Sequence, residues 1–262
     1  ASRAASGKVL QSLAQAVPSL VGGSADLAPS TKTFINGSEA ISTGHFGGRN
    51  FHFGVREHGM CSILNGMALH GGLRVFGATF FVFADYCRPS MRLAALMGLP
   101  IIYVFTHDSF CVGEDGPTHQ PVEQLASLRC IPNLSVLRPA DAGETGAAWV
   151  AALKRESGPT ALLFTRQGLP ILDRSQYPAA SQVEKGAYIL WESSEGVPEL
   201  ILMASGSEVT LALEAAKKLS ADHCVRVVSM PSWDLFEKQS RAYREQVLPP
   251  SCVKRVAIEA GS

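Results

Sequence analysis

The sequence lacks the motifs of several common enzyme classes. Gly-x-Gly-x-x-Gly, Gly-x-x-x-x-Gly-Lys-Ser/Thr, Gly-x-Ser-x-Gly and His-Glu-x-x-His are all absent from its 262 residues. These motifs respectively bind dinucleotides, cradle nucleotide phosphates, present a serine nucleophile and hold a catalytic zinc ion. Their absence disfavours a plain Rossmann dehydrogenase, a P-loop NTPase, an α/β-hydrolase and a zincin.

The sequence also lacks an excess of charge of either sign and any long apolar run. Lys and Arg together number 23, as do Asp and Glu, and Lys217-Lys218 is only a pair. No strong basic field is therefore available to attract nucleic acid or a membrane surface. No apolar run approaches the ~20 residues of a membrane-spanning helix, and the N-terminus has no signal-peptide pattern. We expect no nucleic-acid partner, no membrane partner and a cytoplasmic location.

Paired cysteines are missing as well. The six cysteines stand at positions 61, 87, 111, 130, 224 and 252, none forms a Cys-x-x-Cys pair, and most lie within apolar segments. A disulfide framework or a cysteine metal site is therefore disfavoured. We expect buried free thiols in a reducing cytosol.

The sequence does contain a regular alternation of apolar strands and amphipathic helices. With 46% hydrophobic and 18% charged residues, it can bury a sizeable core. Alternation at these lengths implies right-handed βαβ units around a parallel sheet, so we predict an α/β fold. A capping box is expected at Asp141 and Glu144, and a kink at Pro89. Helices are predicted at 4–17, 56–70, 83–97, from 122 and from 139, and strands near 17–21, 50–54, 74–80, 100–105, 134–138 and 160–166, with a long loop at 28–50.

The alternation is interrupted once, which divides the chain into two units. Residues 167–184 lose their periodicity and contain two prolines. We predict a first domain at 1–168, a linker at 169–184 and a second α/β domain at 185–262. The second unit looks incomplete, so a piece of a longer protein or one subunit of a split enzyme is expected. Its predicted strands are 186–192, 199–204, 225–230 and 253–259, and its predicted helices are 207–220 and 232–246.

Titratable residues crowd into the loop from Thr106 to Pro121, which follows the apolar strand at 100–105. The carboxyl ends of parallel strands are where open α/β sheets bind ligands. The loop contains His107, Glu114, Asp115 and His119, but their spacing fits no recognised metal geometry. Hydrogen bonding to a substrate is the better interpretation of this loop.

Three further clusters stand at predicted strand ends or helix starts. Asp26 and Ser30 lie in a loop, Glu57 begins a helix whose N-terminus would stabilise a carboxylate, and an aromatic stripe starts at Phe80. Taken singly, an ordinary turn, a first-turn glutamate and core packing explain these features better. The stripe, Phe80, Phe83 and Tyr86, is also spaced to form a stacking wall for a flat ring.

Taken together and in order, these stretches closely resemble the transketolase family over essentially the whole chain. The resemblance implies a parallel-sheet, pyrimidine-type thiamine-diphosphate-binding domain followed by an incomplete second α/β domain. The most specific motif is His-Asp-Ser-x-x-Val-Gly-Glu-Asp-Gly-Pro-Thr-His-Gln-Pro. The others are Ser-Ala-Asp-Leu, Arg-Glu-His-Gly-Met, Thr-Phe-Phe-Val-Phe, Pro-Asn-Leu-Ser-Val-Leu-Arg-Pro-Ala-Asp and Leu-Phe-Thr-Arg-Gln-Gly-Leu-Pro.

The resemblance implies a cofactor and an activity. Transketolases use thiamine diphosphate with Mg²⁺ or Ca²⁺ to move a two-carbon ketol unit from a ketose phosphate to an aldose phosphate, in the pentose phosphate pathway and the Calvin cycle. By the family pattern, Glu57 would hydrogen-bond N1′ of the aminopyrimidine and Asp26 would lie near the thiazolium. Phe80, Phe83 and Tyr86 would pack around the pyrimidine.

The family pattern also implies substrate contacts. Arg3, Ser30, His107 and Arg166 would hold the substrate phosphate, which suits cationic and hydroxyl donors. Asp115 would contact a substrate hydroxyl. His119 would act catalytically at the C1 hydroxyl or carbonyl.

Nothing in the chain resembles the family's diphosphate-binding domain, which carries the metal ligands. The resemblance therefore implies half an active site, a homodimer formed through the pyrimidine-binding domain, and no activity for this chain alone. No metal ligand is expected here. The alternatives are dihydroxyacetone synthase, 1-deoxyxylulose-5-phosphate synthase and a non-catalytic dimerisation module, although the last has no need of Glu57.

Overall fold

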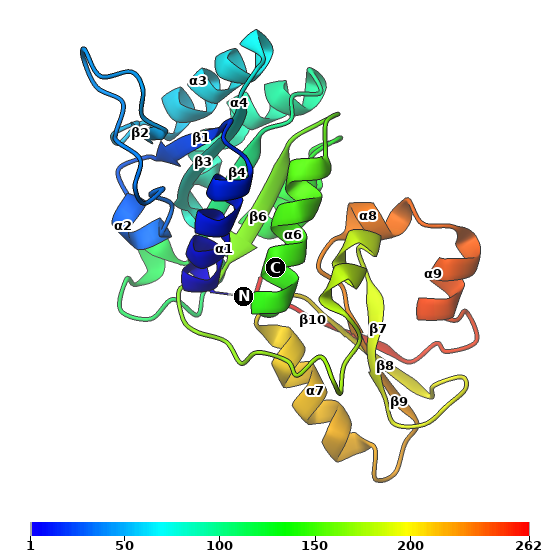
Figure 1. The fold of residues 1–262 in the computed structure, drawn as a ribbon. Helices are drawn as coiled ribbons and strands as arrows, with labels where there is room; N and C mark the ends of the chain where they lie inside the picture. The colour runs from blue at the N-terminus through cyan, green and yellow to red at the C-terminus, as the bar shows by residue number, and fades with distance from the viewer. Residues whose placement is uncertain (1, 262) are drawn as a thin grey trace.

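The computed structural model describes residues 2–261, which form two β-sheets with helices packed around them (Figure 1). All six strands of the first sheet run parallel, in the order β2-β1-β3-β4-β6-β5. The central strand β4 places Val104 beside Ala78 of β3 and Leu162 of β6. The parallel sheet predicted from the sequence is confirmed. The strands are β1 (Leu20–Ser24), β2 (Asn50–His52), β3 (Arg74–Phe80), β4 (Ile102–Thr106), β5 (Ser135–Leu137) and β6 (Thr160–Phe164).

Helices cover both faces of this sheet (Figure 1). Successive residues of a strand point to opposite faces, so Val104 joins the core beneath α1 (Arg3–Ala16) and α6 (Ala142–Lys154). Tyr103 joins the core beneath α3 (Glu57–His70) and α4 (Ala84–Leu96), the helix that contains Pro89. Shorter helical segments are α2 (Ala28–Thr31), η1 (Phe81–Phe83), η2 (Pro117–His119), α5 (Gln124–Arg129) and η3 (Ala180–Lys185).

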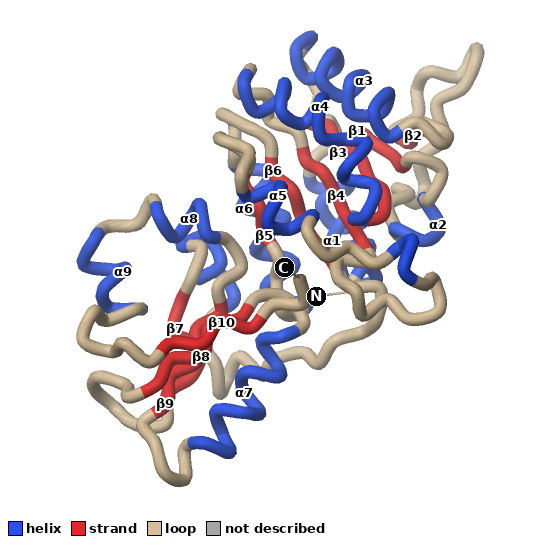
Figure 2. Tube along the Cα trace, turned by 180° about the vertical axis from the view of Figure 1, so that it is seen from behind, coloured by secondary structure: helices blue, strands red, loops and turns tan. Residues whose placement is uncertain are grey.

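The second sheet is mixed, in the order β10-β8-β9-β7, and Figure 2 shows it from behind as a separate layer. Strand β7 pairs antiparallel with β9, whereas β8 is parallel to both β9 and β10. The helix predicted at 232–246 is wrong as a single element, because Ser240 caps a new helix by accepting a hydrogen bond from Tyr243 N. The elements are β7 (Tyr188–Glu192), β8 (Leu200–Ala204), α7 (Glu208–Leu219), β9 (Val225–Ser229), α8 (Trp233–Glu237), α9 (Arg241–Val247) and β10 (Arg255–Ile258).

Helix α6 joins the two sheets. Its predicted capping interaction is confirmed, since Asp141 accepts a hydrogen bond from Glu144 N at 2.8 Å. Asp141 also pairs with Arg174 at 2.8 Å, and buried Glu144 accepts a 2.7 Å hydrogen bond from the Tyr188 hydroxyl. The core on this face is continuous, from Trp149 of α6 to residues of the second sheet.

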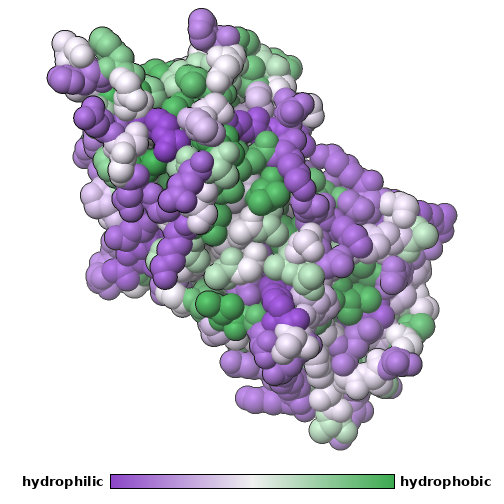
Figure 3. All heavy atoms as spheres, viewed as in Figure 1, coloured by the Kyte–Doolittle hydropathy of each residue, from purple (hydrophilic) through white to green (hydrophobic). Residues whose placement is uncertain are grey.

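All six cysteines are free, as expected, but the expectation that they are buried is only half right. Cys61, Cys87 and Cys252 are buried, whereas Cys111 and Cys130 are exposed because they lie in or beside surface loops. Hydrophilic and hydrophobic residues are interspersed over the face seen in Figure 3. None of the helices within residues 2–261 has the length and hydrophobicity that a membrane crossing requires.

Candidate functional site

The candidate site lies along one edge of the first sheet. Asp26 follows β1, His107 follows β4 and Arg166 follows β6, and these strands are parallel, so their carboxyl ends share that edge. Strand β1 lies between β2 and β3, so the chain reverses its direction across the sheet at this point. A crevice for ligands is expected where the strand order reverses.

A cavity of about 460 Å³ opens at this reversal. Two of its lining residues are carboxylates: Asp26, whose backbone is in the left-handed region at φ 63°, and Glu57, the first residue of α3. Neither carboxylate forms an ion pair with any other residue between 2 and 261, which leaves both available to a ligand. The full lining is Ala25, Asp26, Leu27, Val55, Glu57, Phe83 and Tyr86.

The aromatic stripe connects this cavity with the loop at 106–121. The rings of Phe80 and Phe83 are nearly parallel, 6.1 Å apart, and Tyr86 lies 6.1 Å from Phe83. His107 lies against Phe80 with ring centroids 3.7 Å apart, and His119 stands edge-on to Phe83 at 5.5 Å. The Phe80 ring therefore packs against His107 and does not line the cavity, whereas Phe83 and Tyr86 do.

His107 is held in an unusual environment. It is buried, its φ is 60°, and its Nδ1 lies 2.9 Å from Thr106 Oγ1. Burial, followed by the nearby Arg3 guanidinium, lowers its pKa to about 4. The imidazole is therefore neutral near pH 7 and can donate or accept a hydrogen bond without bringing a charge.

The four residues predicted to hold a phosphate converge. Arg3 donates a hydrogen bond to Ser30 O at 2.8 Å, so Ser30 contributes its carbonyl here while its hydroxyl has no described protein partner. The Arg3 backbone N bonds Thr165 O, the residue before Arg166. Both guanidinium groups lie close enough to His107 to lower its pKa.

Asp115 and His119 adjoin this cluster, since both lie close enough to His107 to affect its pKa. Arg166 pairs with Glu114 and lies 3.2 Å from Asp115 Oδ2. That oxygen is buried and, beyond this ion pair, accepts no hydrogen bond from residues 2–261. His119 Nδ1 lies 2.9 Å from Thr118 Oγ1, which leaves Nε2 for a ligand.

Five contributors to the site were not predicted from the sequence. Ala25, Leu27 and Val55 supply apolar walls of the cavity. Thr106 and Thr118 each contact the Nδ1 of the histidine that follows them. The Thr-His repeat at 106–107 and 118–119 is visible in the sequence and was the available signal for the two threonines.

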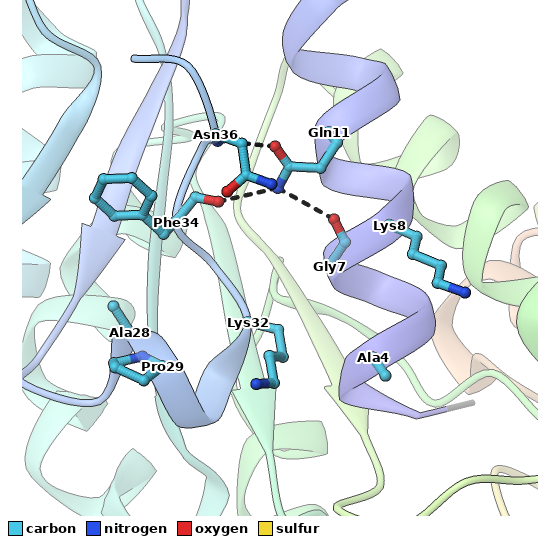
Figure 4. A pocket seen from close by; sticks show the side chains of 9 residues that line it. All are labelled: Ala4, Gly7, Lys8, Gln11, Ala28, Pro29, Lys32, Phe34 and Asn36. Atoms are coloured by element: carbon cyan, nitrogen blue, oxygen red, sulfur yellow. Dashed lines mark hydrogen bonds between the residues drawn. The ribbon is translucent and has the colours of Figure 1, made fainter. Parts of the chain in front are cut away.

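A second cavity, of about 350 Å³, lies between α1 and residues 28–36 and contains none of the predicted site residues. Gln11 bridges its far end by bonding Phe34 O and Asn36 N, each at 2.9 Å. Figure 4 shows the amino groups of Lys8 and Lys32 pointing in different directions, so they do not converge on one anion.

The described part of the chain contains no cluster of three or more His, Cys, Asp or Glu side chains that could hold a metal ion. His107, Glu114, Asp115 and His119 do not form one. The donors that do converge are guanidinium, imidazole and carboxylate groups, which suit hydrogen bonding to an anion and to hydroxyl groups.

Comparisons with known proteins match both sheets. The family model "Transketolase, pyrimidine binding domain" matches residues 1–171, and "Transketolase-like TK C-terminal domain" matches residues 186–262. The transketolase of Bacillus subtilis (strain 168) is 60% identical over 263 residues, covering 100% of this chain and 39% of its own length. This chain thus spans well under half of that relative.

Solved structures agree. Transketolase from Leishmania mexicana superimposes with a TM-score of 0.95 at 46% identity, over 99% of this chain and 38% of that one. A Pichia stipitis transketolase in complex with sedoheptulose-7-phosphate superimposes with a TM-score of 0.92 at 41% sequence identity, over 100% of this chain and 39% of that one. A structure described as a split gene transketolase, inactive β4 tetramer, superimposes with a TM-score of 0.71 at 27% sequence identity, over 97% of this chain and 77% of that one.

Proposed function

Because the chain belongs to the transketolase family, we propose that it supplies half of a thiamine-diphosphate-dependent site that transfers a two-carbon ketol unit from a ketose phosphate to an aldose phosphate. One observation carries the proposal: a single sheet edge runs from the carboxylate-lined cavity, past the aromatic stripe, to the cluster of arginines and histidines. The sedoheptulose-7-phosphate complex of the Pichia stipitis relative supports a sugar phosphate as substrate.

The cavity suits the pyrimidine end of the cofactor, because its walls are mostly apolar and two unpaired carboxylates stand among them. Phe83 and Tyr86 would pack around the ring, supported by Phe80, and Asp26 would face the thiazolium. Thiamine diphosphate, when bound, would supply the carbon nucleophile and the electron sink. Glu57 would hold a proton at N1′ of the aminopyrimidine, since a carboxylate in a dry pocket shares its proton strongly with a ring nitrogen.

The other end of the edge would bind the substrate phosphate. Arg3 and Arg166 can each present two N–H groups to its oxygens, with Ser30 and neutral His107 adding uncharged donors. Arg166 is already paired with Glu114 and Asp115. A phosphate would therefore compete for Arg166 and free these carboxylates.

Two residues would orient the sugar. Asp115 Oδ2 forms an ion pair with Arg166 but accepts no hydrogen bond from residues 2–261, so it can accept one from a substrate hydroxyl. His119 has its Nδ1 occupied by Thr118, so its Nε2 would face the C1 hydroxyl or carbonyl and could move a proton there. Its edge-on contact with Phe83, which lines the cavity, and its nearness to His107 support this role.

The missing half would come from a diphosphate-binding domain, either in the full-length polypeptide or in a partner subunit, and would hold Mg²⁺ or Ca²⁺. We propose a homodimer formed through the α3 and α4 face, which exposes several apolar side chains. They are Ile63, Leu69, Leu93, Leu96 and Met97. The inactive state named for the split gene relative supports the expectation that this chain has no activity alone.

Three finer assignments belong to the same proposal. The boundaries 1–168, 169–184 and 185–262 are supported by the division of the strands between two sheets. The six free cysteines support a reducing compartment such as the cytoplasm. The pathway would be the pentose phosphate pathway.

The proposal is tested by complementation. The chain is mixed with a separately produced transketolase diphosphate-binding domain, thiamine diphosphate and Mg²⁺, and ketol transfer from xylulose 5-phosphate to ribose 5-phosphate is measured. We expect transfer only in the mixture, and a loss of roughly 10²–10⁴-fold with Glu57→Gln. Glu156→Gln, just beyond the C-terminal end of α6, is the matched control and should keep full activity. If Glu57→Gln retained full activity, the proton-holding role would be wrong.

A further inference from the structure

Arg138 is among the most deeply buried charged residues and was not assigned to the site. It directly follows β5, at the same sheet edge, and its side chain is only 1% exposed. Its guanidinium donates to Asp108 Oδ2 at 2.8 Å and to Ser205 O at 3.0 Å, and it pairs with Glu208. A buried charge of this kind is tolerated only when it is fully paired.

The contact between Arg138 and Asp108 is linked to the candidate site through the backbone, because Asp108 is the residue after His107. Asp108 is 4% exposed, has Arg138 as its ion-pair partner, and immediately follows His107. His107 has a left-handed backbone at φ 60°, which a residue other than glycine adopts only when its surroundings hold it there. Fixing Asp108 fixes the chain on one side of this strained residue, and the Phe80 ring contacts its side chain.

The other contacts of Arg138 come from the second domain. Ser205 and Glu208 lie where β8 leads into α7. Two backbone hydrogen bonds join Arg138 to the second domain. Arg138 N donates to Pro231 O at 2.8 Å, and Gly206 N donates to Arg138 O at 2.9 Å. One planar group thus contacts both the His107 loop and the start of a helix in the neighbouring domain.

We propose that Arg138 is a positioning residue: it holds Asp108 so that His107 is presented to the substrate phosphate, and its anchoring by Glu208 makes this presentation depend on docking of the second domain. The inference rests on the phosphate-binding role proposed for His107. Arginine is required because a planar guanidinium can bond several acceptors in fixed directions, whereas lysine offers a compact point charge.

The first test reads His107 directly and requires no activity. Histidine signals of this chain are followed by NMR between pH 3 and pH 8, with His107→Asn assigning the resonance. Arg3, Asp115, Arg166 and His119 are the charged or titratable groups near the ring, and all are retained. In Arg138→Lys we expect the His107 midpoint to rise from about 4 by about one pH unit or more, because the loosened loop admits water.

Asp108→Asn and Glu208→Gln separate the two sides of the contact. Each removes one carboxylate and leaves the other paired with Arg138, so these variants also serve if Arg138→Lys fails to fold. Asp108→Asn should move the His107 midpoint as Arg138→Lys does. Glu208→Gln should move it in the same direction, and an unchanged midpoint would overturn the coupling to domain docking. The matched control is Arg226→Lys, another buried arginine, which bonds Glu192, Gln246 O and Val247 O within the second domain.

The second test uses the assembled enzyme and two donors, one phosphorylated ketose and one ketose without phosphate. Arg138→Lys should raise KM for the phosphorylated donor roughly tenfold, leave its kcat little changed, and leave KM for the other donor unchanged. Arg226→Lys should change neither KM. Unchanged His107 titration and unchanged KM in folded Arg138→Lys would overturn the positioning role. Absence of ketol transfer from the unaltered assembly would count against the proposed function only, since the NMR result stands without it.

Discussion

At the scale of single residues, two of the four described non-glycine residues with a left-handed backbone belong to the candidate site. Of the described residues other than glycine, Asp26, Lys32, His107 and Asn133 have positive φ values near 60°. A conformation of this kind costs on the order of 1–3 kcal/mol and persists where the surrounding structure enforces it. Asp26 and His107 follow β1 and β4. Asp26 lines the proposed cofactor cavity, and His107 belongs to the proposed phosphate site.

The strained His107 also predicts a pH dependence of stability. Its pKa is about 4 when folded, against about 6.5 in an unfolded chain. The unfolded state binds the proton more readily between these values, so the stability contribution is complete above pH 6.5 and is lost as the pH falls toward 4. The loss has an upper limit of about 1.4 kcal/mol per pH unit.

Denaturant titrations at several pH values check this expectation. His107→Asn is the matched comparison, because asparagine tolerates the left-handed backbone and does not titrate. The free energy of unfolding of the unaltered chain should fall more steeply between pH 6.5 and pH 4 than that of His107→Asn. Parallel curves would show that the histidine is not held in its neutral form.

At the scale of helices and strands, patterns within one segment were predictable and relations between distant segments were not. The apolar periodicity of 4–17 and 56–70 gave α1 and α3 nearly to the residue. The antiparallel direction of β7 depends on the path of the long segment before it, which no local pattern encodes. The break at Ser240 arises from a single capping hydrogen bond at 3.2 Å within an amphipathic stretch.

The start of α6 should be more sensitive to substitution than the start of α9. Asp141 is buried and accepts hydrogen bonds from Glu144 N, Leu172 N and Arg174. Asp141→Ala removes the cap and leaves the partly buried Arg174 without its carboxylate, so we expect a loss of about 3 kcal/mol or more. Ser240→Ala removes one hydrogen bond on the surface and should cost about 1 kcal/mol. Chemical denaturation of the two variants compares these losses, and equal values would contradict the anchoring role.

At the scale of the whole molecule, the apolar face on α3 and α4 is the expected contact with a second copy. Leu93 is 48% exposed and Leu96 is 74% exposed, and such side chains gather where an interface will cover them. Leu93→Lys with Leu96→Lys should shift the chain toward monomer in sedimentation velocity runs at several concentrations. Leu211→Lys, on exposed Leu211 of α7, is the control and should leave the distribution unchanged. An unaltered distribution in the double variant would place the interface elsewhere.

The sheet edge that carries the candidate site could be predicted from the sequence, but most contacts between the side chains within the site could not. Loops after parallel strands end at one edge of the sheet, so the strand pattern predicts that the loops with Asp26 and His107 lie at the same edge. The role of Arg166 came from the family resemblance. The Arg138 contacts could not be foreseen, because one joins residues 30 positions apart within the first domain and another joins residues 70 positions apart across the domain junction. Nor does the sequence reveal that Phe80 supports His107 and leaves the cavity wall to Phe83 and Tyr86.

The strand order has a consequence for biosynthesis. Strand β6 lies between β4 and β5, so β5 pairs with a strand made after it. On the ribosome, β5 and the edge of β4 must wait unpaired until Thr160–Phe164 has emerged from the exit tunnel. Until then, the nascent chain presents two open strand edges, which are prone to pairing with other chains. Translation pauses before Thr160–Phe164 has left the tunnel should therefore make the nascent chain dependent on chaperones, whereas pauses after this strand has emerged should remove the dependence that these two edges cause.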